Sequence, residues 1–488
     1  MSPPTAPIEV GNGPKPEFLT TKKSSLISMD ELVQIMEANT LQDDPREKRT
    51  ERSSKLVKAY LIKNEPEFVR VLGFRDRGWM QNKDKGDAFF KAQRDRADNT
   101  DVSGEQKFFR MMIQIADEMN GVTGALSPQT ARGPDMKVLD ICMAPGGYTA
   151  AVLKFNPRAS TFAITLPKEQ GGHPIHVERS RLAGLQLLDV TMLVNEFTDK
   201  PMPPNHPDRE KFLTIRPFKF HSFDLVFCDG MVLRTQQRED YREGNEVIRL
   251  STSQLILAMQ RIKAGGTLVM LLHKIDSFPA ANILHIFSKF SKVEAFKPQK
   301  KHATRSSFYM IAKDVQPGHE AAKAVVEEWK EAWWNATFGG EDGTGMPKVD
   351  PHESAVFNIL EEFGEQLMEM GRPVWRIQGD ALSRTEYASD GSIVRSEGVV
   401  GVPGAVNPSP WRDLRESLKE NVPLQTSSSP GVPVGPSSWR ALRENVPPKS
   451  TDSPVISSPW DVMRESLKER VAQSPTSPTP LDKDLKSI

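Results

Sequence analysis

The stretch KVLDICMAPGGYTAAVLKF (137–155) joins an apolar run, a Pro-Gly-Gly turn and a segment with helical spacing. Such a strand–turn–helix unit is typical of parallel α/β sheets, whose ligands bind beyond the carboxyl ends of the strands. Glycine in this turn lets a ligand approach the backbone closely. The spacing differs from the dinucleotide and P-loop fingerprints, so a nucleoside without pyrophosphate fits better than a phosphate. On its own the motif is better explained as a tight turn, so whether it binds a ligand has to be judged from other segments of the chain.

Strand-like runs recur along the middle of the chain with helical segments between most of them. They cover residues 137–144, 160–166, 185–190, 223–230, 267–273, 292–298 and 306–313. Alternation of strands and helices predicts a mostly parallel sheet with helices on both faces. No long helix separates the last two runs, which therefore form a candidate antiparallel pair. KAGG (263–266) is a candidate helix C-cap that leads into a strand.

Two further side chains follow strands of this predicted sheet. Asp229 ends the run FDLVFCDG and Lys274 follows the run TLVMLLH. If these strands are neighbours, both side chains project into one crevice beside the Pro-Gly-Gly turn. A carboxylate adjusts the pKa of a nearby lysine, and a lysine that can lose its proton can act as a general base. Either residue alone has an ordinary explanation as a solvated strand end or helix cap, whereas the ordered set is more specific.

These segments resemble the FtsJ-like (RrmJ-type) ribose 2′-O-methyltransferase family. The resemblance covers about residues 105–315 and is closest in LDICMAPGGYT (139–149), FDLVFCDGMV, GGTLVMLLHK and FKPQKKHATRSSFYMIAK (296–313). ITLPKEQGGH (164–173) resembles the fungal members. The resemblance implies a class I, Rossmann-like methyltransferase fold with a mostly parallel seven-stranded sheet, S-adenosyl-L-methionine as cofactor, and no metal.

The family's catalytic set is Lys-Asp-Lys-Glu, and the resemblance implies roles for its matching positions. Asp229 matches the aspartate and Lys274 the second lysine, which would accept the 2′-hydroxyl proton. Arg110 stands at the best match to the first lysine, with Lys107 one turn earlier as a rival, and Ser307 stands where the glutamate is expected. Arginine does not exchange a proton at ordinary pH and serine carries no charge, so two of four positions depart from the pattern.

The resemblance also implies which residues contact cofactor and RNA. The expected cofactor residues are Asp140, Pro145, Gly146, Gly147, Tyr148, Asp189 and Asp229, with Asp189 meeting the adenine amino group. No acidic residue that would bind the cofactor ribose is evident directly after the second predicted strand, although Glu169 lies several residues farther along. The basic hairpin 297–305 contributes Lys297, Lys300, Lys301 and Arg305 as expected RNA contacts. The segment 74–96 also mixes cations with aromatic residues, but its four aspartates favour an ordinary solvated helix surface.

The composition limits which classes of protein and which cellular compartments fit the chain. Of 488 residues only 38% are hydrophobic, 38 are proline, and 64 basic residues balance 64 acidic ones. With zero net charge, any nucleic-acid surface is a local patch. The two cysteines, Cys142 and Cys228, favour buried thiols in a reducing compartment over a disulfide framework. No signal peptide or membrane-spanning run is evident, so we expect an intracellular protein of cytoplasm or nucleus that is neither secreted nor bound in a membrane.

The expected organisation has five parts. They are a disordered lead-in (1–25), a helical region (26–104), the methyltransferase domain (105–315), a helical extension (316–385) and a disordered Ser/Pro-rich tail (386–488). Ser28 is the expected cap of the first helix. A Trp-containing phrase recurs in the tail around Trp411, Trp439 and Trp460. It fits either short motifs that fold on a protein partner or duplication drift in low-complexity sequence.

Three functions remain open on the sequence alone. The first is an S-adenosylmethionine-dependent RNA ribose 2′-O-methyltransferase. The second is a methyltransferase-fold scaffold that binds cofactor or RNA without turnover, which the departures at Arg110 and Ser307 favour. The third is a small-molecule O-methyltransferase, against which the basic hairpin argues.

Overall fold

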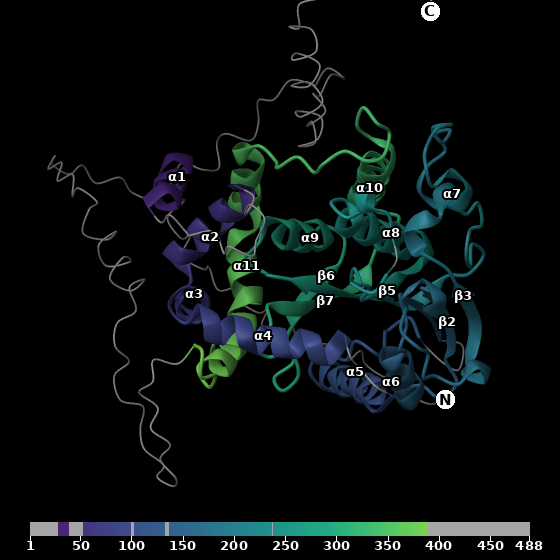
Figure 1. The fold of residues 1–488 in the computed structure, drawn as a ribbon, viewed down its shortest axis with the longest axis horizontal. Coiled ribbons are helices and arrows are strands. Elements are labelled where there is room, and N and C mark those ends of the chain that lie inside the picture. Colours follow the sequence, from purple (N-terminus) through teal and green to yellow (C-terminus); the bar gives the residue numbers. More distant parts are fainter. Residues whose placement is uncertain (1–27, 39–51, 99–101, 132–135, 237, 389–488) are drawn as a thin grey trace, which may run out of the picture.

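Figure 1 shows the computed structural model, which describes residues 28–38, 52–98, 102–131, 136–236 and 238–388. The expected lead-in and the Trp-containing repeats of the tail lie outside these residues. The strands are β1 (Lys137–Ile141), β2 (Ser160–Thr165), β3 (Leu182–Leu187), β4 (Phe223–Cys228), β5 (Ile262–His273), β6 (Lys292–Phe296) and β7 (Ser307–Val315). All seven predicted strands are therefore present, with boundaries shifted by a few residues.

The strands form one sheet in the order β3-β2-β1-β4-β5-β7-β6. The five strands from β3 to β5 are parallel, whereas β7 runs antiparallel to both β5 and β6. The predicted antiparallel pair at the end of the sheet is confirmed. The strand order reverses at β1, whose neighbours are β2 and β4, and open α/β sheets bind ligands at such a switch point.

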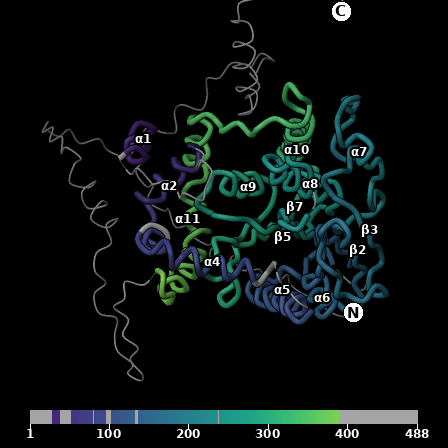
Figure 2. Tube along the Cα trace, in the orientation of Figure 1, coloured from purple at the N-terminus to yellow at the C-terminus, as the bar shows by residue number. Residues whose placement is uncertain are grey.

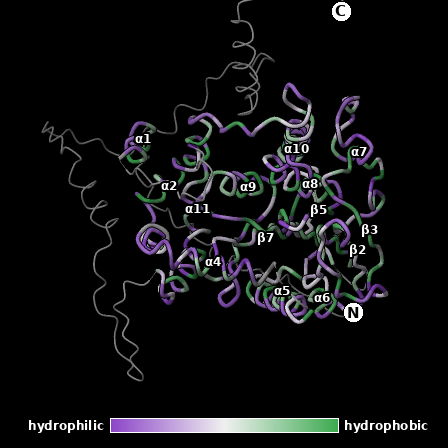
Figure 3. Tube along the Cα trace, viewed as in Figure 1, coloured by the Kyte–Doolittle hydropathy of each residue, from purple (hydrophilic) through white to green (hydrophobic). Residues whose placement is uncertain are grey.

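Helices cover both faces of the sheet (Figure 1). Those that follow β1, β3, β4 and β5 are α6 (Gly147–Phe155), α7 (Val194–Phe197), α8 (Glu246–Arg261) and α9 (Phe278–Ser288). One face packs against α5 and α6 through a buried cluster that includes Met112, Tyr148 and Phe227. The other face packs against α8 and α9 in the larger core. In Figure 3 apolar colour follows these buried strands and α9, and polar colour predominates on α4.

The flanking regions are helical, as predicted. Before the sheet come α1 (Met29–Ala38), α2 (Arg52–Asn64), α3 (Pro66–Asp76), α4 (Lys83–Asp98) and α5 (Val102–Thr123), and after it α10 (Glu320–Phe338) and α11 (Glu353–Leu382). The expected cap of α1 is present, because the Glu31 amide donates to Ser28 Oγ at 3.2 Å. The two helical flanks meet, since α3 and α11 lie side by side (Figures 1 and 2).

One local prediction was wrong. KAGG was expected to cap a helix, but α8 ends at Arg261 and these residues lie inside β5. The pairing of β4 with β5 jumps here, from Phe223 opposite Ile262 to Leu225 opposite Thr267. Gly265 has φ +82°, a left-handed conformation that glycine adopts without strain. The glycines therefore serve a bulge that realigns the strand rather than a helix end.

Candidate active site

Polar residues gather where β1, β4 and β5 end. Strand pairing sets Ile141 opposite Cys228, and Cys228 opposite Met270. Asp229 therefore lies one residue beyond this line and Lys274 four residues beyond it, an offset of about 10 Å along the strands at ~3.3 Å per residue. The two side chains belong to adjacent strands and the same edge of the sheet, with Lys274 farther out.

Asp140, an expected cofactor residue, lies in β1 and is hydrogen-bonded to the helix that follows this strand. It is 2% exposed, and Thr149 Oγ1 donates to its Oδ2 at 2.6 Å. This bond ties the strand to the first turns of α6. It also leaves the carboxylate directed toward the helix start rather than toward solvent, so its influence on a ligand would be electrostatic.

Glycine is required at the two positions of the turn for different structural reasons. Gly146 has φ +99°, and an added Cβ would lie 2.6 Å from Val177 Cγ2 and 2.7 Å from Met143 Sδ. At Gly147 an added Cβ would lie 2.8 Å from the Phe109 carbonyl oxygen, and closer still to Met112. Gly147 is therefore required by the close approach of α5 to α6. The sequence interpretation, in which glycine lets a ligand approach the backbone, did not include this packing requirement.

Tyr148, expected to contact the cofactor, lies in the core instead. It is 2% exposed, stacks on Phe227 with ring centroids 5.4 Å apart, and its hydroxyl hydrogen-bonds that of Tyr309. The first turn of α6 directs this ring onto the sheet rather than toward the turn. Pro145 is also buried, with its carbonyl accepting from the His176 amide at 3.0 Å.

Asp229 lies in an electrostatically unfavourable place for a carboxylate. Burial, and next the nearby charge of Asp140, raise the pKa of Asp229 well above its usual range. Burial likewise raises the pKa of Asp140 to about 7, although its hydrogen bonds with Thr149 oppose the change. A cationic group placed beside these two carboxyls would stabilise their charged forms.

Asp189, the expected adenine contact, begins the short helix 190–192. Its Oδ1 accepts from the Thr191 amide at 2.9 Å, and its Oδ2 accepts from Arg242 at 3.0 Å and from Gln236 at 3.2 Å. Arg242 in turn binds Glu246 on α8, at 2.9 Å. Neither Arg242 nor Gln236 was predicted from the sequence, because they come from the loop and helix after β4, about fifty residues away.

The basic hairpin splits into a buried and an exposed part. Lys297 is 3% exposed, and its Nζ donates to the carbonyl oxygens of His302, Arg305 and Ser307 at 3.2, 2.7 and 2.8 Å. The structure thus contradicts the expected surface position of Lys297, because its three donors hold the hairpin together. Lys300, Lys301 and Arg305 are exposed.

Cations surround the end of β5. Burial, then Arg305 and Lys297, lower the pKa of His273, and the same influences lower the pKa of His302 to about 4. Arg305 is exposed as a whole residue, but burial around its guanidinium and then Arg234 lower its pKa. These shifts place the side chains near one another in a locally positive region, where an anion would be stabilised.

The two departures from the family's catalytic set lie at different depths. Arg110 is exposed on α5, with its guanidinium donating to Gln106 Oε1 at 3.1 Å. Ser307 is 6% exposed at the start of β7 and pairs with His273 of β5. Arg110 therefore stands at the helix that borders the Pro-Gly-Gly turn, and Ser307 beside the strand that leads to Lys274.

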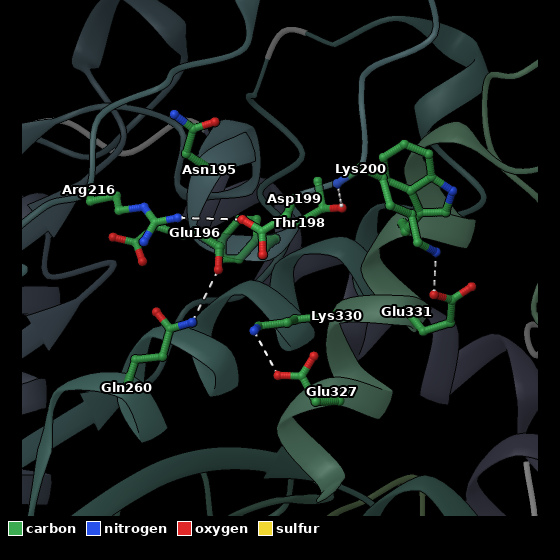
Figure 4. A pocket seen from close by; sticks show the side chains of 12 residues that line it. Asn195, Glu196, Thr198, Asp199, Lys200, Arg216, Gln260, Glu327, Lys330 and Glu331 are labelled. Carbon is green, nitrogen blue, oxygen red and sulfur yellow. Dashed lines mark hydrogen bonds and ion pairs between the residues drawn. The ribbon is translucent and has the colours of Figure 1, made fainter. Parts of the chain in front are cut away.

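A cavity of about 550 Å³ lies elsewhere, between α7, the end of α8 and α10 (Figure 4). Its charged lining is largely paired within itself: Lys200 with Glu331 at 2.6 Å, Lys330 with Glu327 at 2.8 Å, and Arg216 with Asp199 at 3.9 Å. None of the predicted site residues lines it. The cavity therefore does not compete with the edge of the sheet as candidate active site.

Sequence comparison assigns the sheet region to a family. Residues 116–315 match the family model described as FtsJ-like methyltransferase. The chain contains an FtsJ-like methyltransferase domain. The fold class is accordingly that of Rossmann-like methyltransferases, with a mostly parallel seven-stranded sheet and helical flanks. No curated protein matches the chain.

Solved structures show remote similarity to the FtsJ-like domain. One is described as a ribosomal RNA methyltransferase from Plasmodium falciparum, with 16% identity, TM-score 0.27, and coverage of 42% of this chain and 96% of that one. Another is an rRNA methylase from Streptococcus thermophilus, with 9% identity, TM-score 0.24, and coverage of 43% and 95%. An O-methyltransferase family protein from Burkholderia thailandensis has 12% sequence identity and a TM-score of 0.27, and the match covers 51% of this chain and 72% of that one. Similarities this weak say nothing of substrate.

FtsJ-like methyltransferases use S-adenosylmethionine, and the residues at the carboxyl edge fit it. The cofactor carries a sulfonium and an ammonium. Burial raises the pKa of both Asp229 and Asp140, and the charge of Asp140 adds to the rise at Asp229, so the two carboxyls form an acidic pair. Such a pair favours a cationic ligand over an anionic one such as pyrophosphate. Among the described helices, none is long and apolar enough to cross a membrane.

Proposed function

We propose that the protein is an S-adenosylmethionine-dependent RNA ribose 2′-O-methyltransferase. The observation that carries the proposal is the joint position of Asp229 and Lys274, beyond adjacent parallel strands on the edge that also carries the Pro-Gly-Gly turn. This arrangement offers an acidic place for a cationic cofactor and, farther out, an amine for the acceptor hydroxyl.

The chemistry follows from these positions. Bound S-adenosylmethionine supplies an electrophilic methyl group on its sulfonium. Lys274 Nζ, in its neutral form, would accept the proton of the 2′-hydroxyl as the ribose oxygen bonds to that methyl carbon. The bond between the methyl carbon and sulfur would break at the same time, its electron pair would stay on sulfur, and S-adenosylhomocysteine would leave. Asp229 stabilises positive charge on the cofactor side of the site. Asp189, whose Oδ2 accepts from Arg242 and Gln236, is the proposed acceptor for the adenine amino group.

RNA is the proposed acceptor because the surroundings of Lys274 are cationic. Arg234, Arg305, Lys300 and Lys301 lie on the two loops that border the end of β5, and Arg305 and Arg234 are close enough to influence each other. Phosphate groups on either side of a target nucleotide would be bound by such side chains. An acceptor without phosphates would make no ion pairs with these cationic side chains.

A scaffold without turnover is the second candidate, favoured by Ser307. This residue is buried and faces His273 where the family pattern has a carboxylate. A site without that carboxylate can still bind cofactor and RNA. Binding and transfer must therefore be measured separately.

The test uses the full chain, radiolabelled S-adenosylmethionine, and pools of transfer, ribosomal and capped RNA. We expect cofactor binding in calorimetric titration and label transfer to RNA, but not to DNA of the same sequence, which lacks the 2′-hydroxyl. Cofactor binding without transfer to any RNA pool would favour the scaffold. Equal transfer to RNA and DNA would exclude ribose 2′-O-methylation.

A further inference from the structure

The turn after β5, which presents Lys274, has a demanding geometry. Lys274 has φ +51°, a left-handed conformation that a lysine rarely adopts. Its amide donates to the Ser306 carbonyl at 2.9 Å, and its carbonyl accepts from the Ser277 amide at 2.8 Å. Such a turn persists only when neighbouring groups fix it. Those groups determine where the lysine amine lies.

One of them is Asp276, two residues after Lys274. Its side chain is fully buried and binds Arg75 of α3 through both oxygens, with Nη1 at 3.0 Å and Nη2 at 3.3 Å. Burial disfavours the carboxylate, but Arg75, Lys58 and Lys274 together lower the pKa of Asp276 to about 2. The pair is therefore an ion pair throughout the physiological range, and its two-point geometry fixes the direction of the carboxylate.

The second support comes from α11. Gln378 is 1% exposed, and its Oε1 accepts from Arg75 Nη2 at 3.0 Å. Its Nε2 donates to the Thr304 carbonyl at 3.2 Å and approaches Ser306 Oγ at 3.4 Å. Ser306 is the residue whose carbonyl binds the Lys274 amide. One arginine and one glutamine therefore hold both sides of the Lys274 turn.

Neither Arg75 nor Gln378 belongs to the matched family region, which spans 116–315. Arg75 of α3 lies 41 residues before this region and Gln378 of α11 lies 63 residues after it, and the two meet beside the Lys274 turn. We infer that Arg75 and Gln378 are positioning residues, through which the two helical flanks hold the Lys274 turn in its transfer-competent conformation. This inference rests on the proposed function for the role of Lys274 but not for the contacts themselves.

The main test variant is Gln378→Met, which keeps the volume and the Arg75–Asp276 ion pair but removes the bridge to the 304–306 segment. Arg75→Met is the stronger variant, although a buried unpaired carboxylate can unfold the chain. The matched control is Arg70→Met. Arg70 also joins α3 to α11, through Asp380 at 2.5 Å, but it does not touch the Lys274 turn.

The first readout is amide hydrogen exchange in the full chain, which needs no activity. We expect Gln378→Met to accelerate exchange at least fivefold in peptides covering 273–278 and 303–307, with other segments unchanged, and Arg70→Met to leave these peptides as in the wild type. Unchanged exchange in Gln378→Met, or the same acceleration in Arg70→Met, would overturn the inference.

The second readout is methyl transfer to RNA. We expect Gln378→Met to lower kcat about tenfold, while KM for RNA and the Kd for S-adenosylmethionine stay within about twofold. Gln378→Glu, which keeps an acceptor for Arg75, should recover part of kcat. Faster exchange with unchanged kcat would overturn the positioning role. Faster exchange in a chain whose wild type methylates no RNA would support the contacts and contradict the proposed function alone.

Discussion

Arg75 of α3 donates to both carboxylate oxygens of Asp276, at 3.0 and 3.3 Å, and so joins the N-terminal helical flank to the turn that carries Lys274. The candidate catalytic lysine is thus supported by residues outside the matched family region.

Lys274→Arg should abolish methyl transfer while leaving cofactor binding intact. Arginine keeps the positive charge but does not release a proton at ordinary pH, so a general base is lost. We expect kcat to fall by about 10²-fold or more. Single-turnover transfer to RNA measures this, with the Kd for S-adenosylmethionine as control. Undiminished transfer would exclude Lys274 as the base.

Asp140 should stabilise the unliganded protein less and less as the pH rises from about 4 to 7. The folded-state pKa of Asp140 is raised to about 7 from an unperturbed 3.8, so over this range the folded state holds a proton that the unfolded state has lost. Its contribution should decline by on the order of 2 to 4 kcal/mol, and Asp140→Asn should remove this decline, so the difference in unfolding free energy between wild type and variant should change with pH. Urea unfolding at several pH values measures this. An identical slope in the variant would contradict the assignment.

Tyr148 and Tyr309 should behave as a coupled pair. Each single change to phenylalanine leaves one buried hydroxyl without its partner, and should cost about 1 to 2 kcal/mol of unfolding free energy. The double variant should cost less than the sum of the singles. A double-mutant cycle by denaturant unfolding decides this, and strict additivity would show that the hydroxyls do not interact.

Lys300 and Lys301 should contribute to RNA affinity, whereas Lys297 should contribute to stability. Changing both exposed lysines to Gln should weaken RNA binding and lower the salt dependence of log K by roughly two contacts. Lys297→Met should instead lower the unfolding free energy by about 2 kcal/mol or more, because three carbonyl groups lose their donor. Salt-dependent binding curves and thermal unfolding separate the two. The reverse pattern would contradict the structure of the hairpin.

Local sequence signals predicted the sheet well. Each strand is a short apolar run with turn residues at its end, and the order Pro-Gly-Gly, Asp229, Lys274 marked the edge where three strands finish. The cap at Ser28 was equally local. Such features depend only on residues a few positions away in the chain, so they can be predicted from a single sequence.

The predictions for individual site residues failed where the position of a side chain depends on packing between segments that are distant in the sequence. Nothing near Gly147 shows that α5 passes beside it, nothing near Tyr148 shows that Tyr309 lies within hydrogen-bonding distance, and a basic hairpin does not reveal which lysine turns inward. Arg75, Arg242 and Gln378 were missed for the same reason. Their partners lie dozens to hundreds of residues away, and only the folded chain brings them together.

The central claim is tested most directly by identifying the methylated product. Purified chain is incubated with RNA and S-adenosylmethionine, the RNA is digested to nucleosides, and these are separated by mass spectrometry, with Lys274→Arg in parallel. We predict a methyl group on the ribose of one or more nucleosides, present with the wild type and absent with the variant. A methyl group on a base, or no methylated nucleoside from a chain that binds the cofactor, would contradict the account.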